Sequence, residues 1–377
     1  MNFQGNPSRR FFWLDWVRFG AAFWVLVFHA RNGNWTAWEN LEAHFKNKLT
    51  LVFFGITRTG PEAVYIFFVL SGFLVGGKVI EKVMLGKFSI RDYVIERTSR
   101  LFVPLLPALL FTAGLGRLDC QPISFTQLLG NALGLQNIFC DVFAGNDPLW
   151  SLSYEMWFYL LAGFFALTLT SNSSHRVRCF AILGVAVGFA AFTKLSSFYL
   201  YCWCLGAISY SLLSGRAGGI WFLFGLLNSV LGCFLSQVSW GGASVWLKTA
   251  PWLVSSRELA ILTFCLGLGL ILPFLAQLKP GQGFLARFEL AGSRLAGFSY
   301  TLYLTHVPVL HFWEFHLQKR FATFDSPSLL CYGAKLGTCL AIAWLMYLPF
   351  EAQTERVRNW LRRWCVAPAK TGVARNL

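Results

Sequence analysis

The sequence predicts an all-α integral membrane protein, a bundle of about ten transmembrane helices with both termini in the cytoplasm. The chain has 377 residues, of which 56% are hydrophobic and 13% charged, whereas about 25% of the residues of a soluble protein are charged. Apolar runs of roughly 17 residues or more, enough for a membrane helix, recur from end to end. Aromatic residues reach 17%, which is typical of helices with aromatic belts at both membrane surfaces.

Hydropathy places each expected membrane helix to within a few residues. An even number of spans puts both ends of the chain on one side of the membrane. Most of the 32 Lys and Arg residues fall in the segments that would be cytoplasmic if the N-terminus is inside, as the positive-inside rule requires. The first span follows the N-terminal segment without a small-residue cleavage site, which predicts an uncleaved signal anchor. The expected spans are 11–30, 60–80, 101–117, 150–170, 179–193, 197–213, 219–238, 258–277, 297–314 and 329–350.

The segments between the spans indicate one domain. We expect a membrane domain over residues 1–355 and a basic cytoplasmic tail over residues 356–377. Little lies outside the membrane besides three loops. Prolines are expected to break the third and ninth spans, which is tolerated where the backbone lines a cavity. These features are the loops 31–59, 118–149 and 239–257, and the residues Pro104, Pro107 and Pro308.

Charge and cysteine usage exclude two classes of function. The net charge of +15 does not indicate nucleic-acid binding, because the cations cluster between apolar spans and form no basic stripe with interleaved aromatics. None of the ten cysteines forms a Cys-x-x-Cys pair, so we expect no metal site. Cys120 and Cys140 share an expected outer loop, and a disulfide between them stays open.

The first span carries two costly residues. Arg18 and His29 are eleven positions apart, which puts them on nearly one face of a helix and about 16 Å apart along its axis. An ionisable residue inside a membrane helix is a candidate functional residue. Histidine titrates close to neutral pH and suits a general base, whereas an Arg can hold an anion or a carbonyl oxygen. The alternative is a snorkelling Arg and an interfacial His.

Two further polar segments are candidates for a site. Arg97 and Arg100 are side by side on a helix turn and suit phosphate groups, although they also serve as topogenic charge. The segment from Trp150 to Glu155 opens the fourth span. Its polar groups either cap the helix or bind substrate, with Ser153 as a donor to an oxyanion and Glu155 orienting a histidine or accepting a sugar hydroxyl.

The ninth span and the second carry the remaining candidates. Tyr303 and His306 are three positions apart and hence on one helix face. A lone histidine is usually a satisfied core residue, but here it is a second intramembrane histidine beside a Tyr. The Ser71-Gly72 pair in the second span favours close approach of another helix backbone.

Together these motifs resemble the acyltransferase-3 family of integral-membrane O-acyltransferases. The resemblance depends on Arg18-x10-His29, FFVLSGFLVG, Arg97-x-x-Arg100, WSLSYE, SYTLYLTH and the closing PFE, which occur in the order of the family. It implies that Arg18 and His29 are essential and that Arg97 and Arg100 lie near the phosphates of acyl-CoA. We expect the acyltransferase domain without the esterase-like extension that some members carry.

The resemblance also implies the reaction. Members transfer an acyl group, usually acetyl from acetyl-CoA, to hydroxyls of surface polysaccharides or exported molecules. We therefore expect no permanently bound cofactor, acyl-CoA as co-substrate, a carbohydrate or glycolipid acceptor, and a multi-pass location in the bacterial inner membrane. A homo-oligomer stays open. The main alternative is a transporter or flippase without acyl chemistry, which would also need intramembrane charges.

Overall fold

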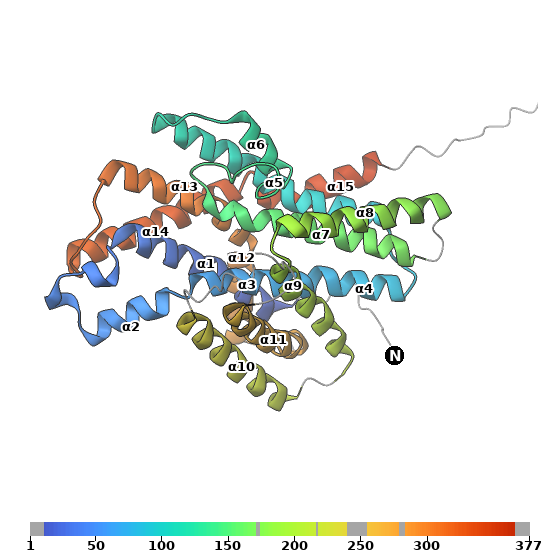
Figure 1. Cartoon of the computed structure of the whole chain (residues 1–377), viewed down its shortest axis with the longest axis horizontal. Helices are drawn as coiled ribbons and strands as arrows, with labels where there is room; N and C mark the ends of the chain where they lie inside the picture. The colour runs from blue at the N-terminus through green and yellow to red at the C-terminus, as the bar shows by residue number, and fades with distance from the viewer. Residues whose placement is uncertain (1–10, 171–173, 216–217, 240–254, 279–282, 366–377) are drawn as a thin grey trace, which may run out of the picture.

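A computed structural model describes residues 11–170, 174–215, 218–239, 255–278 and 283–365. These residues form helices and no β-strand. In Figure 1, α10 and α11 lie on one side of the bundle and α6 on the opposite side. The helices of the bundle are α1 (Phe12–Asn34), α3 (Gly60–Ser71), α4 (Gly77–Met84), α5 (Ile90–Leu118), α7 (Trp150–Leu169), α8 (His175–Lys194), α9 (Ser197–Ser209), α10 (Gly219–Val238), α11 (Ser256–Gln277), α12 (Phe284–Gly297), α13 (Ser299–Leu317) and α14 (Ser326–Tyr347).

The all-helical membrane architecture is confirmed. Each of the ten expected ranges falls on helical structure, and seven helical stretches in the described part of the chain are long and apolar enough to cross a membrane. The first and ninth ranges are helices, α1 and α13, but are not among these seven, and 197–213 is shorter. The charged side chains of Arg18 and Asp15 lower the mean hydropathy of α1, which explains in part why α1 is not among the seven. The protein is therefore a multi-pass helical membrane protein, and the count of ten spans stays a prediction.

Two of the expected loops are partly helical, which corrects the sequence-based prediction, and the third, 239–257, lies mostly outside the described residues. Segment 31–59 contains the end of α1 and helix α2 (Lys48–Thr57), and segment 118–149 contains α6 (Phe125–Ala132). Side-chain caps start both short helices. Asn47 Oδ1 accepts a hydrogen bond from the Thr50 amide at 3.0 Å, and Ser124 Oγ accepts one from the Gln127 amide at 3.3 Å. Such caps satisfy amides that the first helical turn leaves free.

The C-terminal part of the described chain also continues the fold beyond the expected boundary at residue 355. Helix α15 (Thr354–Trp364) packs along α5. Arg91 donates to the Arg362 carbonyl at 2.9 Å, and Arg362 pairs with Asp92 at 3.6 Å. Cys120 and Cys140 are both free in the structure.

The prolines do not break their helices, contrary to expectation. Helix α13 continues through Pro308, and α5 continues through its two prolines. A proline has no amide hydrogen, so Pro308 leaves the carbonyl of Leu304 without its helical donor. The buried Asn146 side chain replaces that donor, with Nδ2 2.9 Å from Leu304 O and 3.2 Å from Thr112 Oγ1. One amide therefore ties the interior of α13 to α5.

Replacing Asn146 by Ala should destabilise the protein by about 1–3 kcal/mol, because it leaves the buried Leu304 carbonyl unpaired. A matched change, Asn228→Ala, removes a partly exposed side chain whose recorded hydrogen bond is to its own helix, and it should have a much smaller effect. Thermal unfolding of the purified variants in one detergent measures both. Equal melting temperatures for Asn146→Ala and the parent protein would show that Leu304 needs no such donor.

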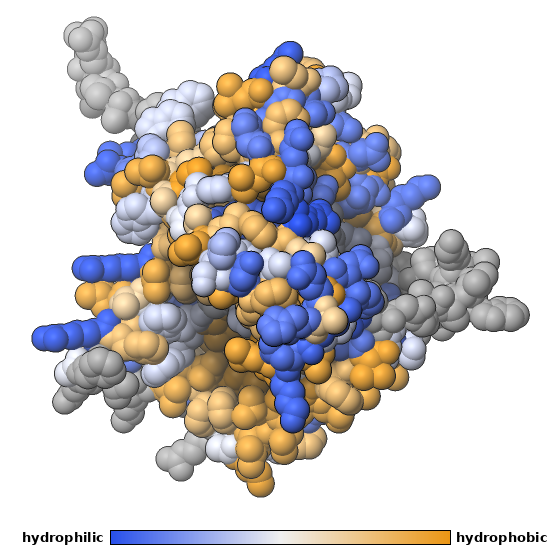
Figure 2. All heavy atoms as spheres, turned by 90° about the vertical axis from the view of Figure 1, so that its left-hand side faces the viewer, coloured by the Kyte–Doolittle hydropathy of each residue, from blue (hydrophilic) through white to orange (hydrophobic). Residues whose placement is uncertain are grey.

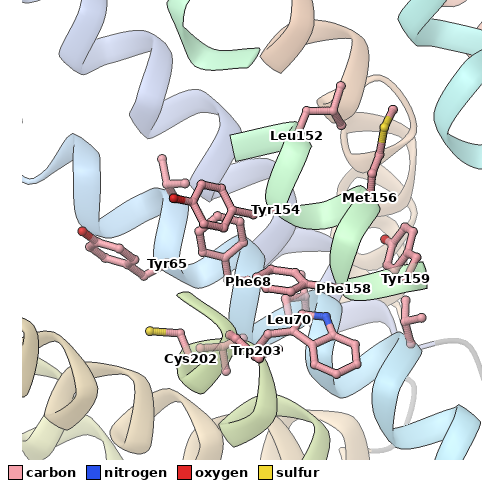
Figure 3. Close-up of a cluster of buried hydrophobic side chains, with 14 of the residues drawn as sticks. Tyr65, Phe68, Leu70, Leu152, Tyr154, Met156, Phe158, Tyr159, Cys202 and Trp203 are labelled. Carbon is pink, nitrogen blue, oxygen red and sulfur yellow. The ribbon is translucent and has the colours of Figure 1, made fainter. Parts of the chain in front are cut away.

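The second expected span packs against α9 at close range, as the Ser71-Gly72 pair predicts. A Cβ on Gly72 would lie 1.9 Å from the Trp203 carbonyl, and a Cβ on Gly206 would lie 2.0 Å from the Val69 carbonyl. A π-helical turn over Gly72–Gly76 joins α3 to α4 at this crossing. Figure 3 shows the aromatic core beside it, where Phe68 of α3 and Phe158 of α7 converge near Trp203 of α9. These contacts fix the wall that carries Ser71.

Candidate functional site

A cavity of about 500 Å³ lies between the cytoplasmic ends expected for several helices, and five cationic and four carboxylate side chains line it. We call it the cationic cavity, after this excess of cations. Helix α1 contributes Arg18, α4 contributes Lys78, α5 contributes two arginines and α15 contributes one. The cavity reaches from the exposed Lys78 to the buried hydroxyls of Ser151 and Tyr303. Its charged lining residues are Arg18, Lys78, Glu96, Arg97, Arg100, Glu155, Glu351, Glu355 and Arg358.

The two arginines expected at phosphates share this cavity, but each also has a protein carboxylate. Arg97 is bonded to Glu96 at 2.5 Å and lies over the Tyr159 ring. Arg100 donates to Glu351 Oε1 at 3.2 Å. Glu351 Oε2 accepts hydrogen bonds from the Thr301 amide at 2.9 Å and its hydroxyl at 2.7 Å. Glu351, in the PFE segment, therefore fixes Arg100 against the start of α13.

Arg18 also lines this cavity, near the N-terminal end of α1. Its Nη2 donates to the Ala296 carbonyl at 3.1 Å and to Asp15 at 3.3 Å. These two acceptors hold the guanidinium between α1 and the end of α12. Its Nε has no hydrogen-bond partner in the described part of the chain. The guanidinium therefore has at least this donor left for a further group.

Glu155 lines the cationic cavity together with both arginines of α5. Its carboxylate accepts a hydrogen bond from Tyr159, and the Tyr159 hydroxyl is 3.4 Å from Ser71 Oγ. The contacts described for Glu155 thus lie within this cavity. Glu155 was expected to orient a histidine, but the ring beside His29 is that of His306. Glu155 and Tyr159 form a polar wall facing the arginines.

The two intramembrane histidines meet, which the sequence left open. The ring centroids of His29 and His306 are 5.3 Å apart, and that of Tyr303 is 5.8 Å from His306. His306 is only 1% exposed. Its Nδ1 lies 2.8 Å from the Tyr303 carbonyl and 3.1 Å from the Leu302 carbonyl. Because carbonyl oxygens only accept, Nδ1 carries the hydrogen of the neutral ring.

The other nitrogen of His306 is available for chemistry. With Nδ1 protonated, Nε2 holds a lone pair. This Nε2 is buried and has no hydrogen-bond partner among the described residues. An unpaired buried acceptor costs about 1–3 kcal/mol, so the site is suited to a ligand hydroxyl or another proton donor. His29 is only partly buried and is the more accessible member of the pair.

Tyr303 connects the histidines to the cavity. Its hydroxyl is 2.7 Å from Ser151 Oγ, and both residues line the deep end of the cavity. Sequence reasoning treated Ser151 only as a helix cap and did not single out Lys78. The signal for Ser151 was its place in the same WSLSYE motif as Glu155, but only the fold shows which serine faces the cavity.

Ser153 and Trp150 have other neighbours. The Ser153 hydroxyl is fully buried and donates to the Gly134 carbonyl at 3.0 Å, as does Trp157 Nε1. Trp150 packs among the aromatic rings of Phe68, Tyr154 and Tyr199. Neither residue lines the cationic cavity, whereas Tyr303 and Ser151 both do.

Comparison with known proteins identifies the family of the chain. A family model described as an acyltransferase domain matches residues 11–348, nearly the whole chain. No curated protein and no solved structure was found to match. The matched region includes both histidines, all the arginines of α1 and α5 named above, and Glu155. The chain therefore belongs to the acyltransferase-3 family.

Proposed function

We propose that this protein moves an acyl group, acetyl being the expected one, from cytoplasmic acyl-CoA to a hydroxyl of a surface glycan or exported sugar-containing molecule. The observation that carries the proposal is the cationic cavity, which is lined at one end by Tyr303, and the Tyr303 ring lies 5.8 Å from that of His306. CoA is polyanionic, and arginines bind phosphate through charge-assisted hydrogen bonds. In this proposal its phosphates contact Arg97, Arg100 and Lys78, and the membrane is the bacterial inner membrane with both termini cytoplasmic.

The acyl-bearing arm would extend from the cations toward the deep end of the cavity. Arg18 lines the path, and its free Nε suits the thioester carbonyl oxygen. Tyr303 and Ser151 supply hydroxyl donors at the deep end, where an oxyanion formed on that carbonyl would need them. The two hydroxyls are held by a hydrogen bond to each other and by the Pro148 carbonyl, so one of them must turn away from its present acceptor to donate to the oxyanion.

The chemical step is then acyl transfer between a thiol and a hydroxyl. His29 removes the proton of the acceptor hydroxyl, whose oxygen attacks the thioester carbonyl. The C–O ester bond forms and the C–S bond breaks, and the CoA thiolate leaves with the proton that His29 releases. In the relay variant of the mechanism, His29 itself first receives the acyl group, and trapping an acyl-imidazole would distinguish it from direct transfer.

The test is purified full-length protein in lipid nanodiscs with labelled acetyl-CoA and a panel of simple glycosides. Release of CoA together with label on the glycoside supports the proposal. Binding or movement of a glycan lipid without CoA consumption would instead identify a transporter.

Replacing Arg97 by Ala should weaken acyl-CoA binding by roughly ten- to a hundredfold, because a hydrogen bond to a charged group contributes about 1.5–3 kcal/mol. Calorimetric titration with a non-hydrolysable acyl-CoA analogue measures the dissociation constant. Arg178→Ala is the matched control, since it removes an exposed arginine of α8 and should leave binding unchanged. Equal losses in both variants would mean that net charge, not the cavity, binds CoA.

A further inference from the structure

A second cavity lies at the other end of the same helices. Its volume is about 460 Å³. Helix α13 lines the cationic cavity with residues up to Tyr303 and this one with residues from Pro308 onward. Helix α5 does the same, with Arg97 and Arg100 at the first cavity and Thr112 and Gly116 at the second, where Asp119 follows the end of the helix. We call this second cavity the acidic cavity, after Asp119 and Glu314.

The charge of the acidic cavity is opposite to that of the first. Its ionisable lining residues are Asp119, His311 and Glu314. Glu314 is partly compensated, because Arg320 lies 3.6 Å from its Oε2. A cavity of this kind disfavours an anionic occupant.

Asp119 supplies the observation that indicates a ligand. Its side chain is 10% exposed, and Oδ1 is buried without a hydrogen-bond partner among the described residues. The nearest cationic group recorded for it is His316 Nδ1 at 3.9 Å. That nitrogen lies 2.9 Å from the Phe312 carbonyl, which takes up its hydrogen. A buried carboxylate oxygen left unpaired is costly, and a hydroxyl donor from a ligand would satisfy it.

The acidic cavity lies next to the histidine pair along α13. His311, which lines this cavity, is five positions after His306 on the same helix. Between the two cavities, α13 carries His306, and α1 carries His29 between Arg18 and Gly33. A Cβ on Gly33 would meet Glu314 Oε1, so α1 also reaches the acidic side. The histidines thus lie between a cationic cavity and an acidic one.

We propose that the acidic cavity binds the acceptor, and that it takes a neutral or amino sugar in preference to an anionic one, with Asp119 accepting a hydrogen bond from a sugar hydroxyl. The role of the sugar as acceptor rests on the proposed acyl transfer, whereas the binding of a sugar in the acidic cavity does not depend on it. Figure 2 views the end of the molecule where α2 lies and shows hydrophilic residues gathered across its middle, which suits entry of a polar sugar.

The experiment measures sugar binding without any acyl-CoA. Full-length protein in nanodiscs is titrated with methyl glucoside, methyl glucosaminide and methyl glucuronide, and saturation-transfer NMR gives the dissociation constants. The glucoside and the glucosaminide should bind at least tenfold more tightly than the glucuronide. Asp119→Asn should weaken glucoside binding at least tenfold, since the amide has one neutral acceptor oxygen where the carboxylate has two charged ones. Asp141→Asn, an exposed residue of the same connecting segment, should leave it unchanged.

Several outcomes would overturn the assignment. They are glucuronide binding as tight as glucoside binding, unchanged binding in Asp119→Asn, and no binding of any of the three sugars at millimolar concentration. Thermal unfolding checks that the Asn variant folds. Glu314→Gln is a second variant at the same cavity, and it should reduce the difference in affinity between the glucoside and the glucuronide. Sugar binding at Asp119 without CoA consumption would refute the acyl transfer alone. Acyl transfer with an unchanged KM for the sugar in Asp119→Asn would refute the acidic cavity alone.

Discussion

Replacing His29 by Ala should lower acyl transfer by roughly a hundred- to ten-thousandfold, the contribution typical of a general acid–base residue. His29 is the partly exposed member of the histidine pair, it lies between the cationic and the acidic cavity, and its ring contacts His306. Its loss removes the more accessible of the two imidazoles that can take the acceptor proton. Transfer of label from acetyl-CoA to a glycoside measures the rate.

The control for this prediction separates chemistry from binding. His175→Ala removes an exposed histidine of α8 and should leave the rate unchanged. Acyl-CoA binding by His29→Ala should also be unchanged, because His29 does not line the cationic cavity. Full acyl transfer by His29→Ala would exclude both the base and the acyl-relay roles.

The sequence could predict those features of the fold and the site that depend on one segment or on one pair of packed surfaces. Hydropathy finds helices because a membrane span needs a continuous apolar length, and helical spacing relates Arg18 to His29 within one helix. The close approach of another helix to Ser71-Gly72 was also predictable, whereas the partner, α9 with Gly206, was not. These are rules for one segment or for one pair of surfaces.

Contacts between distant segments could not be predicted in the same way. Nothing in the spacing indicates that Arg100 binds Glu351, 251 positions away, or that Asn146 supplies the donor that Pro308 lacks. The prolines were expected to break helices because the rule considers the helix alone, and a side chain from another segment satisfied the freed carbonyl. For the same reason the sequence could list Ser153 and not Ser151, although only the latter meets Tyr303.

Replacing His306 by Ala should reduce acyl transfer about as much as replacing His29, and the double variant should be little worse than either single one. The reason is geometric. Backbone carbonyls fix the tautomer of His306, its Nε2 is unpaired, and its ring contacts His29, so His306 positions His29 and the two act as one unit. Residues that act as a unit give strongly non-additive losses. Rates of the two single variants and the double variant, measured with acyl-CoA binding as a folding check, give the coupling.

The conservative variant His306→Gln makes this a test of positioning. A glutamine can present an acceptor oxygen near the place of Nε2, so it should restore part of the rate that Ala loses while leaving the KM for acyl-CoA unchanged. A purely structural role predicts the opposite pattern, with parallel losses of thermal stability, CoA binding and rate in both variants. Multiplicative losses in the double variant would show that the histidines act independently, and His306 would then be a separate group whose unpaired nitrogen serves another proton.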